Sequence, residues 1–224
     1  MAVAMSAGAL RGAHAVEAGG AATESMGGVA VIVLSILALL GVVPRVLTPI
    51  AGIVFGIAFM VEGAAIAARQ ATLIGQTDQT GVQELEVGSG VTIELTIGAA
   101  AIVLGVLALI GVVPAILMPA LTTAAGAGLI LSAGSVQRLN EVQIGITNPN
   151  VTAQGASVAR IATSHAAGVQ FLAGVAVTIL GILGLTRTGL PLTLSSVGLL
   201  VLGCALTLSG TALASRMLRL VRGQ

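Results

Sequence analysis

Long apolar runs, interrupted by short polar segments, dominate the pattern of this chain. Runs without a charged residue cover Ser25–Pro44, Leu95–Gln137, Ala166–Thr186 and Thr188–Ser215. Each reaches the roughly 18 residues that an apolar helix needs to cross about 30 Å of hydrocarbon. A shorter run, Val46–Val61, continues after Glu62 as far as Arg69. The pattern predicts an all-α polytopic membrane protein with helices of about 20 residues.

A turn that contains two prolines occurs twice. "LLGVVPRVLTP" spans Leu39–Pro49, and "LIGVVPAILMP" spans Leu109–Pro119. The apolar segments on both sides of the turns also match, and a more diverged third copy runs from Leu172 to Arg216. We therefore predict six transmembrane helices as three repeated helical hairpins, residues 24–69, 94–139 and 170–216. They belong to a single membrane domain, 1–224, with polar cytoplasmic linkers at 70–93 and 140–164.

The two prolines of each turn have different predicted roles. The first, Pro44 or Pro114, is expected to stop the incoming helix, because proline disfavours helix in the residue before it. The second, Pro49 or Pro119, is expected in the first turn of the returning helix, where its missing N–H is not needed.

Composition supports a lipid environment. The chain is 56% hydrophobic and 8% charged, with a mean hydropathy of +1.10. A soluble domain carries about 25% charged residues, so the bilayer is the expected first partner. The net charge of +1 gives no bulk field that would attract nucleic acid, and we expect no nucleic-acid partner.

The arginines predict an orientation. If each hairpin crosses the membrane twice, the termini and both linkers lie on one side. Seven arginines fall on that side, and the short turns hold only Arg45 and Arg187. The positive-inside rule then places both termini in the cytoplasm and the protein in the cell (inner) membrane.

One acidic residue, Glu62, lies clearly inside an apolar run. Its preferred role is helix packing, as a neutral or Arg-paired acid, and proton or cation handling is the alternative. Counted from the turn prolines, the other two repeats have serine at this position. The predicted intramembrane polar layer therefore consists of Glu62, Ser132 and Ser209.

A second set of polar residues is predicted at the membrane interface. It consists of Glu24, Glu94, Gln170 and His165. Glu24 and Glu94 are expected to open the first helices of their hairpins, where the helix dipole stabilises an acid, and capping is the preferred role. With no HxxxH or CxxC spacing, we expect no metal site and no cofactor.

The repeats resemble a known family. Gly-rich aliphatic helices, the "ILGILGL" motif at Ile179–Leu185, the proline turn and second helices with "VEG" or "LSG" are similar to the HdeD-like membrane proteins. The resemblance covers Gly27–Arg69, Gly98–Arg138 and Gly174–Arg216. It implies six spans built from short two-helix repeats. The family is linked to acid resistance, but this chain has fewer aromatics and longer linkers, so the resemblance is used for architecture alone.

Two classes of function remain open. The chain has no catalytic motif, few charges, many small residues and no Trp or Tyr to form an aromatic belt. These features favour a structural or accessory membrane protein and not an enzyme. Such a protein would be a subunit of a larger assembly with other membrane subunits, or it would form a homo-oligomer. The alternative is a small proton or ion channel or transporter that uses Glu62.

Overall fold

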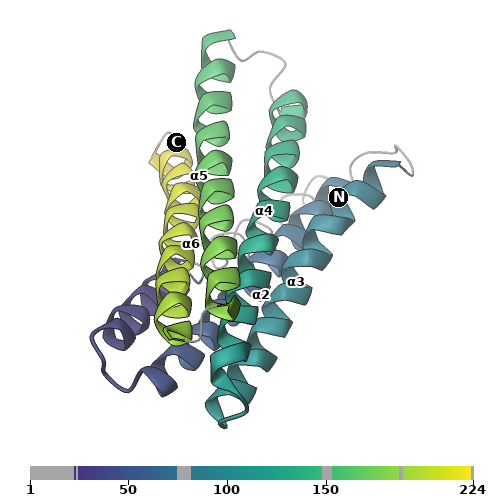
Figure 1. Cartoon of the computed structure of the whole chain (residues 1–224). Helices are drawn as coiled ribbons and strands as arrows, with labels where there is room; N and C mark the ends of the chain where they lie inside the picture. The colour runs from purple at the N-terminus through teal and green to yellow at the C-terminus, as the bar shows by residue number, and fades with distance from the viewer. Residues whose placement is uncertain (1–22, 24, 75–81, 148–152, 187–188, 223–224) are drawn as a thin grey trace, which may run out of the picture.

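The computed structural model describes residues 23, 25–74, 82–147, 153–186 and 189–222, and these are helical apart from the turns (Figure 1). An N-terminal helix includes Ser25–Leu39. It is followed by α2 (Pro44–Ile74), α3 (Val82–Leu109), α4 (Pro114–Thr147), α5 (Ala153–Thr186) and α6 (Pro191–Arg222). The described residues contain no strand, which agrees with the predicted all-α class.

Four of the helices contain stretches long and apolar enough to cross a membrane. The stretches are Pro44–Ala64, Pro114–Ala133, Gly168–Thr186 and Pro191–Gly210. Two shorter apolar stretches lie in the N-terminal helix (Ser25–Leu39) and in α3 (Ile93–Leu109). In the part of the chain that the structure describes, this is the composition of a helical membrane protein.

The second helices of the predicted hairpins, α2, α4 and α6, contact one another. They supply most of the large buried side chains. Phe55 and Phe59 are fully buried and stack with ring centroids 5.3 Å apart. Around them lie the buried aliphatic side chains Met118, Leu121, Leu129, Leu199, Leu202 and Leu206. The core of the bundle is therefore closely filled with apolar groups.

Helices α3 and α5 pack more extensively against the preceding helix than against the following one. Helix α3 has its largest contact with α2, and α5 has its largest contact with α4. Glycines allow the close approach: a Cβ placed on Gly98 would lie 2.8 Å from the carbonyl oxygen of Gly56, and one on Gly174 would lie 2.8 Å from that of Gly126. Small residues of this kind let membrane helices approach backbone to backbone.

The turn between the N-terminal helix and α2 begins at a glycine. Gly41 has a φ of +85°. Its N–H donates to the carbonyl of Ala38, and the N–H of Val42 donates to that of Leu37, over 3.1 and 3.0 Å. This is the Schellman arrangement, which satisfies the last carbonyls of a helix. Gly41 therefore ends the incoming helix.

The first proline of the turn begins the returning helix. The carbonyl of Val43 accepts hydrogen bonds from Val46 and Leu47, so Val43 caps α2 and Pro44 is its first residue. Pro49 lies inside α2. The predicted roles of the two prolines are therefore wrong. A glycine already ends the incoming helix, and proline is best suited to the first helical position, where no N–H is required.

The α3–α4 turn repeats this geometry. Gly111 has a φ of +93°, and Gly111 and Val112 donate to Ala108 and Leu107. Val113 accepts from Ile116 and Leu117, and Pro114 opens α4. Helix α6 likewise opens at a proline, Pro191, after Leu190, whose carbonyl accepts from Leu194.

The helices extend into the predicted polar linkers. Helix α2 ends at Ile74 and α3 begins at Val82, within linker 70–93. Helix α4 ends at Thr147 and α5 begins at Ala153, within linker 140–164. These segments contain ordinary helix formers such as Gln, Glu, Val and Ala, and extending an existing helix avoids the cost of nucleation.

Candidate functional site

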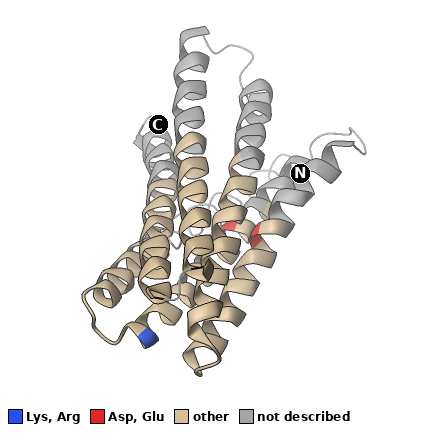
Figure 2. Ribbon diagram, viewed as in Figure 1, with Lys and Arg blue, Asp and Glu red and all other residues tan. Residues whose placement is uncertain are grey.

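Two acidic residues from different helices lie together in the bundle. Glu62 of α2 is 9% exposed and Glu94 of α3 is 1% exposed. A Cβ placed on Gly63 would lie 3.0 Å from the Cβ of Glu94 and 3.4 Å from its Oε2. Helix α2 therefore meets Glu94 at the residue next to Glu62. Figure 2 shows the two acidic positions side by side, and the one basic residue that it colours, Arg45, lies at the turn end of the bundle.

Gly63 allows this contact. A larger side chain at this position would occupy the space of the Glu94 carboxyl group, so glycine lets α3 bring Glu94 against α2. The interface between these two helices thus places Glu94 against the residue next to Glu62.

The acids lie at one end of the apolar segments. Eighteen positions separate Pro44 from Glu62, which is about 27 Å along a helix. The apolar run of α2 reaches its next charge at Arg69, seven residues after Glu62, and the uncharged run of α3 begins directly after Glu94, at Leu95. Glu62 and Glu94 are therefore both close to the end of the bundle opposite the turns. The sequence had separated them, with Glu62 inside the membrane and Glu94 at the interface, but the structure places them at one level.

The other two members of the predicted polar layer form hydrogen bonds within their own helices. Ser132 is fully buried, and its hydroxyl donates to the carbonyl of Leu129 over 3.3 Å. The Ser209 hydroxyl reaches the carbonyls of Ala205 and Leu206, each over 3.1 Å. A layer that joins Glu62, Ser132 and Ser209 stays a prediction.

The structure describes only some of the residues predicted to lie at the membrane interface. Glu94 does not open its helix, because α3 begins twelve residues earlier at Val82. Gln170 likewise lies well inside α5, which begins at Ala153. The capping role predicted for Glu94 is therefore wrong, since the polar linkers continue the helices. Glu24 and the side chain of His165 lie outside the described residues.

A second polar contact joins α2 and α6 near the turn end. The hydroxyl oxygens of Thr48 and Ser196 are 2.9 Å apart, and both residues are fully buried. Ser35 of the N-terminal helix is also fully buried, and its hydroxyl has no hydrogen-bond partner. Sequence reasoning missed this contact. The available signal was a hydroxyl residue about one helical turn after a helix-opening proline, as at Thr48 after Pro44 and Ser196 after Pro191.

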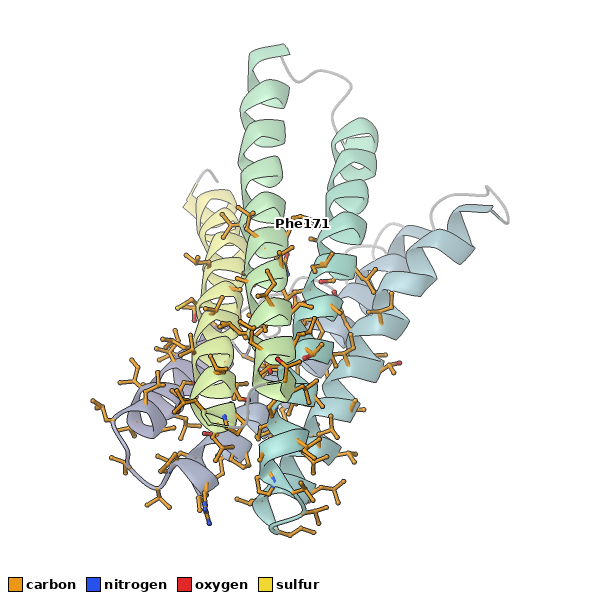
Figure 3. All side chains as sticks on the ribbon, viewed as in Figure 1. Phe171 is labelled. Atoms are coloured by element: carbon orange, nitrogen blue, oxygen red, sulfur yellow. The ribbon has the colours of Figure 1, made fainter. Side chains whose placement is uncertain are left out.

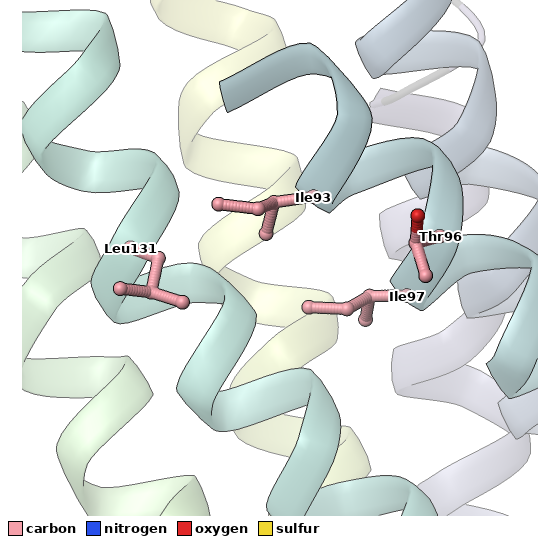
Figure 4. Close-up of a pocket in the computed structure, with 4 residues that line it drawn as sticks. All are labelled: Ile93, Thr96, Ile97 and Leu131. Carbon is pink, nitrogen blue, oxygen red and sulfur yellow. The ribbon is translucent and has the colours of Figure 1, made fainter. Parts of the chain in front are cut away.

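A shallow apolar hollow lies beside the acids, between α3 and α4. It has a volume of about 280 Å³ and is lined by Ile93, Thr96, Ile97 and Leu131. Ile93 and Ile97 point toward Leu131, whereas the Thr96 hydroxyl points away from it (Figure 4). Leu131 is 55% exposed, so the hollow opens to the surroundings of the bundle. Its lining suits an acyl chain better than a polar substrate.

The described side chains contain no group of three or more His, Cys, Asp or Glu residues that could hold a metal ion. Comparison of the chain with protein-family models, with curated proteins and with solved structures gave no match. The resemblance to HdeD-like proteins therefore stays an expectation about architecture. Within the described part of the chain, the chemistry that the geometry offers is two buried carboxyl groups near one end of a largely apolar bundle.

Proposed function

We propose that this protein is a structural or accessory subunit of a membrane assembly, which binds other membrane subunits or copies of itself and catalyses no reaction. The observation that supports this proposal is the apolar core of the bundle, which is filled with side chains. Phe55 and Phe59 lie with Met118, Leu199 and other large aliphatic side chains where α2, α4 and α6 meet. A conducting pore needs a polar or wettable lining along its axis. A bundle closed by such side chains is suited to packing.

The proposed architecture is six spans in three hairpins, at 24–69, 94–139 and 170–216. Equivalent glycine contacts support it, because each joins the first helix of one hairpin to the second helix of another. They are Gly98 with Gly56, Gly174 with Gly126, and Gly28 with Gly203. In this arrangement the second helices form the centre, the first helices form the rim, and the third hairpin contacts the first.

The rim supports association with lipid and protein. Large apolar side chains of the N-terminal helix, α3 and α5 are about half exposed, among them Val33, Val103 and Ile179. Phe171 of α5, labelled in Figure 3, is 46% exposed. We propose the cell membrane as the location, with both termini in the cytoplasm. Cysteines at Gln79 and Thr188 test this: with Cys204→Ser in the background, an impermeant maleimide should label position 188 in intact cells and position 79 only after lysis.

The decisive experiment measures the native mass of the protein together with any partners that co-purify with it. The tagged chain is extracted from its own membrane in a mild detergent, and every co-purifying chain is identified. An unrelated six-span protein with the same tag is the control. A defined complex well above 21.9 kDa is expected. A monomer without specific partners would contradict the accessory role.

A second candidate function rests on the two acids. We propose as an alternative that Glu62 and Glu94 bind a proton or cation in a small channel or transporter. Their burial side by side supports it, since intramembrane acids commonly serve ion or proton pathways. Liposomes with a pH-sensitive dye would report proton flux from Glu62→Gln and Glu94→Gln, with Ser195→Ala, whose hydroxyl donates within its own helix near the turn end, as the control. Flux that is absent in the parent, or equal in all variants, would remove this alternative.

A further inference from the structure

The α3–α4 turn presents an unusually apolar tip. The segment Leu109–Pro119, "LIGVVPAILMP", has no polar side chain. Ile110 is 69% exposed, and three further side chains of the tip are about half exposed, namely Val112, Val113 and Ile116. In Figure 1 this turn lies at the lower end of the bundle, and Figure 3 shows side chains that project outward there.

Most of the backbone N–H groups of this turn have acceptors within the hairpin. Five N–H groups between residues 110 and 117 donate to carbonyls of the same hairpin, with distances of 2.9–3.1 Å: those of Ile110, Gly111, Val112, Ile116 and Leu117. Pro114 has no N–H to satisfy. Water would satisfy such groups without cost at an exposed loop. Hydrocarbon would not, so these internal bonds lower the cost of placing the turn in lipid.

The other two connections carry charge. The first turn has Arg45 directly after Pro44, and Arg45 is exposed. The α5–α6 connection, "LTRTGLP" at Leu185–Pro191, contains Arg187 between two threonines. An arginine can hold a turn at the headgroup level. The α3–α4 turn lacks such an anchor.

The length of α3 agrees with a buried tip. Between Glu94 and the end of the helix lie 15 residues without a charge, Leu95–Leu109, which is about 23 Å of helix and shorter than the roughly 30 Å of the hydrocarbon layer. If Glu94 lies near one surface of that layer, the turn falls beneath the other surface.

We infer that the α3–α4 turn lies among the acyl chains of the bilayer and does not emerge into water. The inference rests on the proposed membrane location. Acyl chains are the proposed surroundings because the tip exposes four large apolar side chains at the end of an apolar bundle and has no charge that would hold it in water.

Spin labels test this inference. In the full chain with Cys204→Ser, a label at Val112→Cys is compared with one at Gly189→Cys, an exposed position with no atom within 4 Å of its Cβ site. A label at Ile110→Cys provides a second position if the first variant folds poorly. The protein is reconstituted in phosphatidylcholine vesicles, and collisions with oxygen and with a water-soluble nickel chelate are measured.

At position 112 we expect a ratio of oxygen to nickel collisions severalfold higher than at position 189. A ratio like that at 189 would show a turn in water. Low access to both reagents would show a tip covered by protein, and either result overturns the inference. Vesicle flotation is measured in parallel: a chain that does not float with the vesicles contradicts the membrane location itself.

Discussion

Gly28 of the N-terminal helix lies directly against Gly203 of α6. A Cβ placed on Gly28 would lie 2.8 Å from the carbonyl oxygen of Gly203, and one placed on Gly203 would lie 2.9 Å from that of Gly28. This contact brings the first helix of the bundle against the last. Because the backbones themselves touch, neither position has space for a side chain.

A larger side chain at either glycine of this contact should destabilise the bundle. Gly203→Val would drive methyl groups into the backbone of the N-terminal helix, and we expect a loss of about 1–3 kcal/mol in the free energy of unfolding. Thermal unfolding in detergent, followed by circular dichroism, would measure it. The control is Gly168→Ala, at a helical position with no atom within 4 Å. Its stability should stay equal or rise by up to about 1 kcal/mol. Equal losses from the two substitutions would contradict the contact.

Val113 should be replaceable by glycine at no cost to stability. Val113 has a φ of +34°, a region that branched residues rarely adopt. We expect Val113→Gly to leave the melting temperature unchanged or raise it, because relief of this strain is worth about 1–2 kcal/mol per residue. The neighbouring Val112→Gly relieves no such strain and should lower stability. If Val113→Gly lowered the melting temperature more than Val112→Gly, the result would contradict the strained, positive φ of Val113.

Gly111 should tolerate no side chain despite its open surroundings. A Cβ there would meet no atom within 4 Å, but the φ of +93° is unfavourable for any other residue. Gly111→Ala should cost about 1–2 kcal/mol through backbone strain alone. The measurement is the same unfolding experiment, with Gly189→Ala as the control. A neutral result at position 111 would argue against the Schellman turn.

The two phenylalanine environments give a test of the core. Phe59 is fully buried and stacked on Phe55, whereas Phe171 is 46% exposed. Phe59→Ala should leave a cavity and cost about 3–5 kcal/mol. Phe171→Ala should cost under about 1 kcal/mol, because its ring is partly outside the packed interior. Similar losses at both sites would show that the filled core does not exist as described.

The buried hydroxyl pair should show energetic coupling. A double-mutant cycle with Thr48→Val and Ser196→Ala isolates the hydrogen bond between α2 and α6. We expect a coupling of about 0.5–1.5 kcal/mol. Ser132→Ala paired with Ser196→Ala provides a control cycle, because Ser132 donates within its own helix. A coupling energy near zero between Thr48 and Ser196 would contradict the hydrogen bond between their hydroxyl groups.

The sequence by itself determined the helical class, the apolar stretches and the positions of the turns. Long uncharged runs specify helices that prefer lipid, because hydrocarbon requires internal backbone hydrogen bonding. The repeated "GVVP" was enough to locate both turns. It did not reveal which residue stops the helix, since that depends on the positive φ of Gly41 and Gly111.

Only the tertiary structure decided which helices touch. Apolar periodicity cannot distinguish a lipid-facing side from a buried one, because lipid and core are equally apolar to a leucine. The pairing of Gly98 with Gly56, and the placement of Glu94 beside Gly63, join residues more than thirty positions apart. In sequence, Glu62 and Glu94 belonged to two different sets at two expected depths. The packing of α3 on α2 places them at one level, and no local pattern encodes that packing.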